Sequence, residues 1–317
     1  MGASRQVNSK IKVLITGASG FVGRRFMEAF REHEVVGLRY SRSKPGLIAL
    51  DLRNPFAVRA CLEDLRPEVV IHCAARPSVD WCELNRSEAR SINLLPVRFL
   101  ADKCARLGAK LVFISTDYVF DGLHGPYSET EPANPINEYG RLKLEGERAI
   151  TRLTERHLIV RTTNVYGFDR ESKNFLMANL PRLARGERVL VASDQFSNPT
   201  AVDDLCWVVR DLITSGCTGT FHVAGPDLVN RADWLRQAAH TFGLNHRLIS
   251  GMSTGELDQP TPRPKRSGLI SDRLPPIFAR RLTHLRDGLA AMKKEWDQHR
   301  GEQPEIAAAS LGGAANA

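Results

Sequence analysis

Short apolar stretches alternate with amphipathic ones through the first half of the chain, and no other feature of the sequence limits the possible folds as much. Residues 12–16 (KVLIT) predict a buried strand, which is followed by a glycine-rich turn and a helix at about 21–32. Strands rich in β-branched residues and bounded by helices are typical of a parallel sheet that is covered on both faces. We therefore predict an α/β fold with a doubly wound parallel sheet. The same pattern predicts further strands at 34–39, 47–51, 68–73, 110–115 and 157–161, with helices at 56–65, 86–107 and 137–155.

The alternation becomes irregular after residue 162, which indicates a second, smaller lobe. Helices are expected at 174–185, 202–214 and 230–242, and residues 220–224 (TFHVA) are expected to return to the main sheet. Both ends of the chain are polar or lack buried periodicity, and we expect them to be disordered. The predicted division is a tail at 1–9, a sheet domain at 10–164 with returns near 200–225, an interleaved smaller lobe at 165–296, and a tail at 297–317.

The composition is that of an ordinary globular protein and argues against several classes of function. The formal charge is +8 and the isoelectric point is near 9.4, but the basic residues are scattered, so we expect no nucleic-acid partner. The six cysteines form no CxxC pair and no His/Cys ligand spacing, which argues against a metal site and favours reduced thiols. No apolar run has the length of a membrane helix, and the first ten residues do not resemble a signal peptide. We expect a cytoplasmic protein without a membrane partner.

Residues 17–23 (GASGFVG) connect the first predicted strand to the first helix. Their GxxGxxG spacing differs from the general GxGxxG fingerprint, but the physical reason for the glycines is the same. Glycine permits a tight turn and lets backbone N–H groups approach a pyrophosphate, and the helix dipole favours the anion. A glycine turn alone is weak evidence, because any connection between a strand and a helix can need positive φ angles. The position of this turn is the one that a dinucleotide site requires, and we predict such a site here.

The end of the second predicted strand bears on the choice of cofactor. An NAD site usually has an Asp or Glu there to hold the ribose 2′-hydroxyl, and the segment LRYSRSK contains no carboxylate. Arg39 and Arg42, with Ser41, can instead form a cationic pocket for a 2′-phosphate, although an exposed basic loop would have the same sequence. This favours NADPH over NADH. Asp51 and Leu52 follow the third strand, where the carboxylate would accept a hydrogen bond from the adenine amino group or serve as a helix N-terminal acid.

Tyr139 and Lys143 are four residues apart at the start of a predicted helix and therefore share one helical face. An ammonium near a phenol favours the phenolate, so we expect Lys143 to lower the pKa of Tyr139, which can then give a proton to a carbonyl oxygen. Thr116 ends the fifth strand, at the sheet edge where ligands of such folds bind, and its hydroxyl can hold the same oxygen. Asn93 lies in the preceding helix, where its amide would hold a water near Lys143 or be an ordinary surface residue. The YxxxK pattern alone is common, so the prediction depends on these positions.

Several segments together resemble the extended short-chain dehydrogenase/reductases: GASGFVG, CAA at 73–75, STDYVFDG at 115–122, YGRLKLEGE at 139–147 and NVYG at 164–167. Within that superfamily, the chain resembles the dTDP-4-dehydrorhamnose reductase group, because many nucleotide-sugar epimerases have SSxxVYG in place of STDYVFDG. The segment DQFSNPT and the Arg-Pro pair before SGL resemble the later motifs of that group. The resemblance covers roughly residues 11–275.

The resemblance implies a Rossmann domain for the cofactor and a smaller C-terminal lobe for a nucleotide-sugar substrate. It implies that Tyr139 donates the proton, that Lys143 binds the ribose, and that Thr116 orients the substrate carbonyl. The implied activity is NADPH-dependent reduction of the 4-keto group of a nucleotide-activated deoxysugar, with NADP(H) as cofactor and NAD(H) as the alternative. The residues implied at the cofactor are Gly17, Ser19, Gly20, Phe21, Val22, Gly23, Ala74, Ala75 and Arg76. The residues implied at the substrate are Thr116, Asp117, Tyr118, Asn164, Asn174, Thr200 and Arg263.

Two other functions are open at this stage. A nucleotide-sugar epimerase or dehydratase has the same catalytic residues, but keeps NAD bound and regenerates it. The regulatory subunit of methionine adenosyltransferase also resembles this group, binds an NADP-type cofactor and serves as a partner protein. Trp81 and Cys82 are unexpected in a reductase of the rhamnose pathway, which leaves the sugar open. Exposed helices of this fold often pair as two-fold dimers, so a homodimer is a further expectation.

Overall fold

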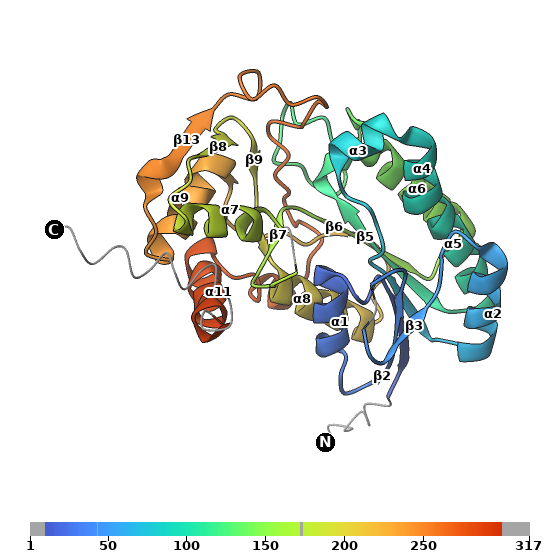
Figure 1. Ribbon diagram of the computed structural model, residues 1–317. Helices are drawn as coiled ribbons and strands as arrows, with labels where there is room; N and C mark the ends of the chain where they lie inside the picture. The colour runs from blue at the N-terminus through green and yellow to red at the C-terminus, as the bar shows by residue number, and fades with distance from the viewer. Residues whose placement is uncertain (1–9, 43, 172–173, 300–317) are drawn as a thin grey trace.

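The computed structural model describes residues 10–42, 44–171 and 174–299, and its centre is a parallel sheet of seven strands (Figure 1). The strand order is β11-β6-β5-β4-β1-β2-β3, so the chain winds outward from β1 in both directions. This order confirms the predicted doubly wound α/β fold. The predicted tail at 1–9 and residues 300–317 of the other tail lie outside the described residues. The strands are β1 (Lys12–Thr16), β2 (Glu34–Arg39), β3 (Leu47–Ala49), β4 (Val69–His72), β5 (Lys110–Thr116), β6 (His157–Thr162) and β11 (Gly219–His222).

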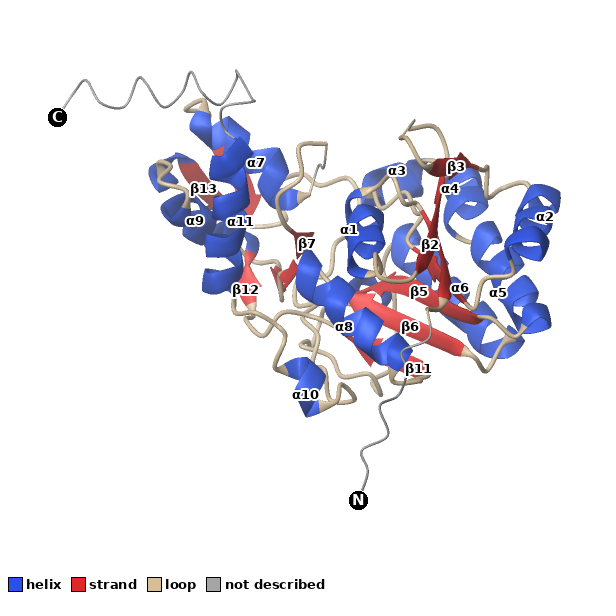
Figure 2. Ribbon diagram, turned by 90° about the horizontal axis from the view of Figure 1, so that it is seen from below, coloured by secondary structure: helices blue, strands red, loops and turns tan. Residues whose placement is uncertain are grey.

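Helices cover both faces of the sheet because both faces are apolar. Successive residues of a strand point to opposite faces, and in β1 Val13 and Ile15 face one helical layer while Leu14 faces the other. The first layer contains α1 (Phe21–Ala29) and α8 (Val202–Thr214). The second contains α2 (Pro55–Leu65), α5 (Leu95–Leu107) and α6 (Glu138–Leu153), and Figure 2 shows the two layers on either side of the strands.

The helix predicted at 86–107 is two helices, α4 (Arg86–Asn93) and α5. Pro96 lies in the first turn of α5 and has no N–H to donate to the preceding turn. Leu94, between the two helices, leaves the helical region, with φ −120° and ψ −49°. The break places Asn93 at the end of a helix instead of in its middle.

A smaller lobe follows the sheet and has its own apolar core (Figure 1). This core contains the fully buried Trp234 and joins helices α7, α9 and α11 to a parallel pair of strands, β8 and β13. The elements of the lobe are α7 (Phe175–Ala184), β8 (Val189–Ala192), β9 (Phe196–Ser197), β12 (Val229–Asn230), α9 (Arg231–Thr241), η2 (His246–Leu248), β13 (Ile249–Met252) and α11 (Leu285–His299). The remaining short elements are α3 (Val79–Leu84), η1 (Asp117–Val119), β7 (Val165–Tyr166), β10 (Thr200–Ala201) and α10 (Pro276–Ala279).

Helix α11 was not expected from the sequence, although its signal is present there. Leu285, Leu289, Met292 and Trp296 are spaced by four, three and four residues, and all four are buried in the lobe core. The helix ends at His299, so residues 297–299 are helical and do not belong to the tail predicted from 297. The alanine- and glycine-rich sequence that follows obscures this boundary.

The packing of α11 predicts a specific loss of stability. Leu289 is fully buried in the lobe core, so Leu289→Ala is expected to lower the free energy of unfolding by about 2–5 kcal/mol through lost contacts and a cavity. Leu190→Ala is the matched control, because Leu190 on β8 is 57% exposed and should change stability by less than about 1 kcal/mol. Urea denaturation of the two variants measures both effects, and equal losses would show that α11 is not part of the lobe core.

Candidate active site

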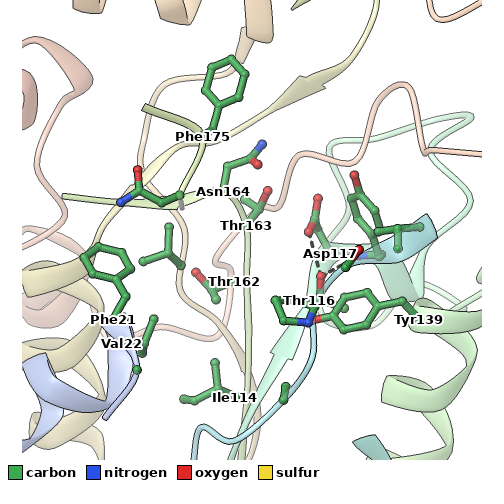
Figure 3. Close-up of a pocket in the computed structure, with 18 of the residues that line it drawn as sticks. Phe21, Val22, Ile114, Thr116, Asp117, Tyr139, Thr162, Thr163, Asn164 and Phe175 are labelled. Atoms are coloured by element: carbon green, nitrogen blue, oxygen red, sulfur yellow. Dashed lines mark hydrogen bonds between the residues drawn. The ribbon is translucent and has the colours of Figure 1, made fainter. Parts of the chain in front are cut away.

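A cleft of about 930 Å³ opens at the carboxyl edge of the sheet, beside the lobe. Gly17, Cys73, Thr116 and Thr162 line it from the ends of four neighbouring strands, β1, β4, β5 and β6. Phe175, the first residue of α7, lines it from the lobe. Figure 3 shows Phe21 and Val22 at one end of this group of side chains and Tyr139 at the other. The cleft therefore joins the predicted phosphate turn to the predicted catalytic residues.

The turn at 17–23 can be made only with glycine at its closest contacts. Gly17 has φ +68°, and a Cβ there would lie 2.8 Å from the Cα of Ala74. A Cβ on Gly23 would lie 2.2 Å from the carbonyl oxygen of Gly17. Helix α1 begins directly after the turn and has no acidic residue in its first turn that would oppose an anion. Of the predicted cradle, Gly17, Gly20, Phe21, Val22 and Gly23 line the cleft, whereas Ser19 is buried beside it.

Helix α6, which carries Tyr139 and Lys143, is fixed at its start by Asn137, a residue that was not predicted from the sequence. The Asn137 side chain accepts a hydrogen bond from the N–H of Gly140 (2.9 Å) and donates one to the carbonyl of Pro262 (3.1 Å). It is fully buried, so these bonds are shielded from water. Asparagine is a favoured N-cap residue, and its place two residues before Tyr139 was the available signal. The cap also ties α6 to the loop that carries Arg263.

Lys143 lines the cleft one helical turn after Tyr139, as predicted, but its ammonium has a defined partner in the protein. Its Nζ donates to the carbonyl oxygen of Ile114 (2.7 Å) and lies 4.3 Å from the centre of the Phe113 ring. Burial lowers the pKa of Lys143 to about 8, against smaller effects of neighbouring acidic groups that raise it. The Lys143 ammonium therefore loses its proton more readily than an exposed lysine does.

The expected lowering of the Tyr139 pKa is wrong for this structure. Burial raises the pKa of Tyr139, and the nearby Asp117, Cys82 and Tyr118 raise it further, because their negative forms disfavour a phenolate. The ammonium of Lys143 is turned to Ile114 and is itself destabilised by burial, so it does not offset these effects. Tyr139 is therefore fully protonated at neutral pH, the state that a proton donor needs.

Thr116 ends β5 and lines the cleft next to a buried carboxyl group. Its Oγ1 donates to Asp117 Oδ1 (3.1 Å) and accepts from the N–H of Tyr118 (3.2 Å), as the dashed lines in Figure 3 partly show. Burial raises the pKa of Asp117 to about 6, while hydrogen bonds, including one from the hydroxyl of Ser267, lower it. Asp117 and Tyr118 also line the cleft, which agrees with their predicted position.

The predicted role of Asn93 beside Lys143 does not agree with the structure. The Asn93 amide oxygen accepts from the N–H of Arg76 (2.8 Å), and its Nδ2 donates to the carbonyl of Arg76 (3.2 Å) and to Cys82 Sγ (3.5 Å). Its bonding capacity is used to hold the segment after β4. The Cys82 thiol, whose pKa burial raises to about 11, packs in the same place, and the Arg76 guanidinium lies 3.7 Å above the Trp81 ring. Trp81 and Cys82 therefore support this segment, in which Ala75 lines the cleft and Ala74 contacts Gly17.

Only part of the predicted 2′-phosphate pocket lines the cleft. Arg42 does so, whereas Arg39 donates to the carbonyl of Tyr40 (3.3 Å) and Ser41 is exposed outside the lining. The Nε of Arg39 is buried and has no partner among the described residues. Asp51 is bound by Arg53, with Nη2–Oδ2 at 2.7 Å, and neither Asp51 nor Leu52 lines the cleft. The predicted adenine contact of Asp51 therefore competes with an ion pair.

Three of the four remaining substrate residues line the cleft, namely Asn164, Asn174 and Arg263. Thr200 does not, so its predicted contact with the sugar nucleotide is wrong. Its side chain is fully buried, and its hydroxyl donates to the carbonyl of Thr163 (2.9 Å) and accepts from the N–H of Gly225 (3.2 Å). Thr200 joins β10 to the end of β6 and supports the wall of the cleft from behind.

The residues that line the cleft without having been predicted as site residues include Asp80, Gln195, Arg231 and Gln259. Asp80 reaches it from the first turn of α3, and Arg231 from the start of α9. The side-chain amide of Gln195 donates a hydrogen bond to the amide oxygen of Gln259 (2.8 Å). Asp80 and Arg263 form a bidentate ion pair (2.9 and 2.6 Å) between segments 183 residues apart. Such contacts follow from the tertiary fold and leave no periodic signal.

Other classes of site find no support in the part of the chain that the structure describes. Within it, no group of three His, Cys, Asp or Glu side chains could hold a metal ion. The six cysteines are free thiols. Across the described segments, no helix combines the length and the apolar character needed to cross a membrane.

Known proteins resemble the chain over nearly all of its described length, and residues 11–298 match the family model of the RmlD substrate binding domain. The dTDP-4-dehydrorhamnose reductase of Mycobacterium tuberculosis is 34% identical over 288 residues, covering 88% of this chain and 91% of that protein. Methionine adenosyltransferase 2 subunit beta of Xenopus tropicalis is 32% identical over 298 residues, covering 88% and 86%. The crystal structure of dTDP-4-dehydrorhamnose reductase from Bacillus anthracis in complex with NADP has a TM-score of 0.82 at 30% identity, covering 90% of this chain and 99% of that one. The resemblance seen in the sequence is confirmed, and the chain belongs to the RmlD substrate-binding domain family.

Proposed function

We propose that this protein is an NADPH-dependent reductase of the 4-keto group of a nucleotide-activated deoxysugar. The observation that carries the proposal is the meeting of the glycine turn, Thr116, Tyr139 and Lys143 in one cleft. A phosphate-binding turn at one end and a protonated phenol at the other suit the reduction of a carbonyl group. The reductases of Mycobacterium tuberculosis and Bacillus anthracis, similar over nearly the whole chain, support this substrate class.

The residues present fit a dinucleotide. The turn at 17–23 has no room for side chains at Gly17 and Gly23, which keeps its backbone open to a pyrophosphate. The hydroxyl of Thr162 is buried at the cleft and has no partner among the described residues, so a polar group of a ligand can bond it. Arg42 supplies a positive charge in the cleft for a 2′-phosphate. When bound there, the nicotinamide would supply hydride to the substrate carbon.

The roles of the protein side chains in the reaction follow from their protonation states and hydrogen bonds. Tyr139 carries the proton that the reduced carbonyl oxygen takes up, and its raised pKa keeps that proton in place until charge develops on the oxygen. The Thr116 hydroxyl can orient the same carbonyl oxygen. In the structure, this hydroxyl donates to the carboxyl group of Asp117. The Lys143 ammonium uses one of its three N–H groups on the carbonyl of Ile114, which leaves two for a ribose hydroxyl of the cofactor.

A second candidate is a non-catalytic partner subunit. The similarity to methionine adenosyltransferase 2 subunit beta, 32% identical over 298 residues, supports it. The presence of all three catalytic side chains in the cleft favours the reductase. Oxidation of NADPH with a dTDP- or UDP-linked 4-keto-6-deoxysugar, followed at 340 nm, separates the two. Absence of turnover in a protein that binds NADPH would favour the partner subunit.

The proposed proton donor predicts a selective loss of rate. Tyr139→Phe removes the phenolic proton but keeps the ring, so kcat is expected to fall roughly 10²- to 10⁴-fold. Binding of NADPH, measured by calorimetry, should be unchanged. Tyr40→Phe is the matched control, because Tyr40 is 62% exposed and lies outside the cleft. Full turnover by Tyr139→Phe would overturn the mechanism.

The proposed cofactor predicts a change in selectivity at Arg42. Arg42→Ala removes the cation of the β2–β3 loop that lines the cleft, so affinity for NADPH should fall roughly 10- to 100-fold, the loss of a charged hydrogen bond. Affinity for NADH should not change, because NADH has no 2′-phosphate. Arg59→Ala, on an exposed face of α2, is the control. Equal losses for both cofactors would contradict the assignment of Arg42.

The raised pKa of Asp117 predicts a pH-dependent stability difference. Folding favours the protonated carboxyl, so the stability of the wild type relative to Asp117→Asn is highest below pH 3.8 and falls as pH rises through about 6. The difference between these pKa values corresponds to a decrease of roughly 3 kcal/mol. Urea denaturation of both proteins between pH 4.5 and 7.5 measures the slope. A difference that does not change with pH would show that Asp117 titrates normally in the folded protein.

A further inference from the structure

Two arginines line the substrate side of the cleft, and their surroundings differ. Arg263 comes from the loop after β13, and Arg231 is the first residue of α9. A guanidinium that is already bound by a carboxylate has little free capacity for a second anion, whereas one without an acidic partner attracts an anionic ligand. The partners of each arginine therefore indicate which one receives the negative charge of a substrate.

Arg263 is already neutralised within the protein. Its Nη1 and Nη2 donate to the two carboxylate oxygens of Asp80 at 2.9 and 2.6 Å, the bidentate geometry that makes such pairs strong. Nη1 also donates to the carbonyl of Thr261 (2.5 Å). The Arg263 guanidinium lowers the pKa of Asp80, so the carboxylate is ionised at neutral pH. An anionic ligand at Arg263 would have to displace Asp80 or accept its repulsion.

Arg231 has no such partner. No carboxylate of a described residue lies within 4.0 Å of its guanidinium, although the cleft around it is partly shielded from water. Its guanidinium contacts the amide oxygen of Asn164 at 3.4 Å and lies over the ring of Phe175 at 5.2 Å, two side chains labelled in Figure 3, and it also interacts with the Tyr118 hydroxyl. Its charge acts on the cleft at longer range: burial raises the pKa values of Tyr118 and Asp117, and the positive charge of Arg231 lowers both.

The position of Arg231 suits a phosphate group near the sugar. The neighbouring Asn164 lies at the end of β6, beside the strand that carries Thr116, and offers a side-chain amide. Phe175 provides a flat apolar surface on the lobe side of the cleft. One unpaired guanidinium between an amide and an aromatic ring can hold a phosphate by a fork of N–H donors while the uncharged parts of the ligand pack against the ring.

We propose that Arg231 is the residue that binds the diphosphate of the nucleotide-sugar substrate, while Arg263 holds the cleft wall through Asp80. This inference rests on the proposed function, because it assumes a nucleoside-diphosphate substrate. It changes the role expected for Arg263 from direct ligand to structural partner. Substrate affinity in this protein is then set at the start of α9, a place that no sequence motif marks.

Calorimetric titration with dTDP and UDP tests the proposal without requiring turnover. Arg231→Gln should weaken binding of the diphosphate roughly 10- to 100-fold, the loss of a charge-assisted hydrogen bond, while NADP⁺ binding stays unchanged. Arg263→Gln should weaken it much less. Arg236→Gln is the matched control, since Arg236 lies on the same helix and is paired with the exposed Asp233 at 2.8 Å.

The outcomes separate this inference from the proposed function. Binding of dTDP or UDP that is lost in Arg263→Gln but kept in Arg231→Gln overturns the inference and leaves the function intact. A wild-type protein that binds NADP⁺ but neither dTDP nor UDP overturns the nucleotide-sugar function itself. If Arg231→Gln also loses NADP⁺, Arg231→Lys decides. Lysine keeps the charge without the fork, so a loss of diphosphate affinity with NADP⁺ binding retained supports Arg231, and unchanged affinity rejects it.

Discussion

The geometry of the cleft depends on an ion pair buried beneath it. Arg161 on β6 donates to both carboxylate oxygens of Glu147 on α6, at 3.0 Å from Nε and 2.7 Å from Nη2, and Ser115 on β5 donates to the same carboxylate at 2.5 Å. Both charged side chains are less than a tenth exposed, so removing one partner would leave a buried charge at a cost of about 3–5 kcal/mol. Glu147 lies one turn after Lys143 on the buried face of α6. The pair therefore fixes the distance between α6, which carries Tyr139 and Lys143, and the end of β5.

The sheet could be predicted from the sequence because its strands are apolar on both faces. β1 and β2 have the predicted ends, and α8 the predicted bounds of 202–214. The errors occur where a short-range effect interrupts the periodicity. Pro96 divides one predicted helix into α4 and α5, and the amphipathic spacing of α11 was overlooked beside a tail of small residues. Strands of two residues, such as β7 and β10, have no sequence signal, because their pairing is decided by the fold around them.

The positions of the proposed catalytic residues could be predicted because the proposed chemistry fixes their spacing. Tyr139 and Lys143 must share a helical face, and Thr116 must end a strand at the ligand edge. Their protonation states were not predictable, since the pKa of Tyr139 depends on burial and on Asp117, which tertiary packing brings near it. Asn93 shows the same limit. Its amide was expected to hold a water near Lys143 or to lie on the helix surface, but it is buried and bonds the backbone of Arg76.

Which arginines and lysines can bind an anionic ligand depends on their ion pairs with carboxylates and not on the net charge of +8. Arg53 is held by Asp51, Lys44 by Glu171 and Arg263 by Asp80. Arg42 and Arg231 line the cleft, and no carboxylate of the described residues lies within 4.0 Å of either, although the charge of Arg231 acts on Asp117. A paired arginine holds the cleft wall, and the carboxylate of its partner repels anions, whereas a guanidinium without a close carboxylate can bind an anionic ligand. Paired arginines such as Arg263 thus maintain the shape of the cleft, whereas Arg42 and Arg231 are available to bind an anion. A sequence motif records only the residue type and cannot distinguish the two.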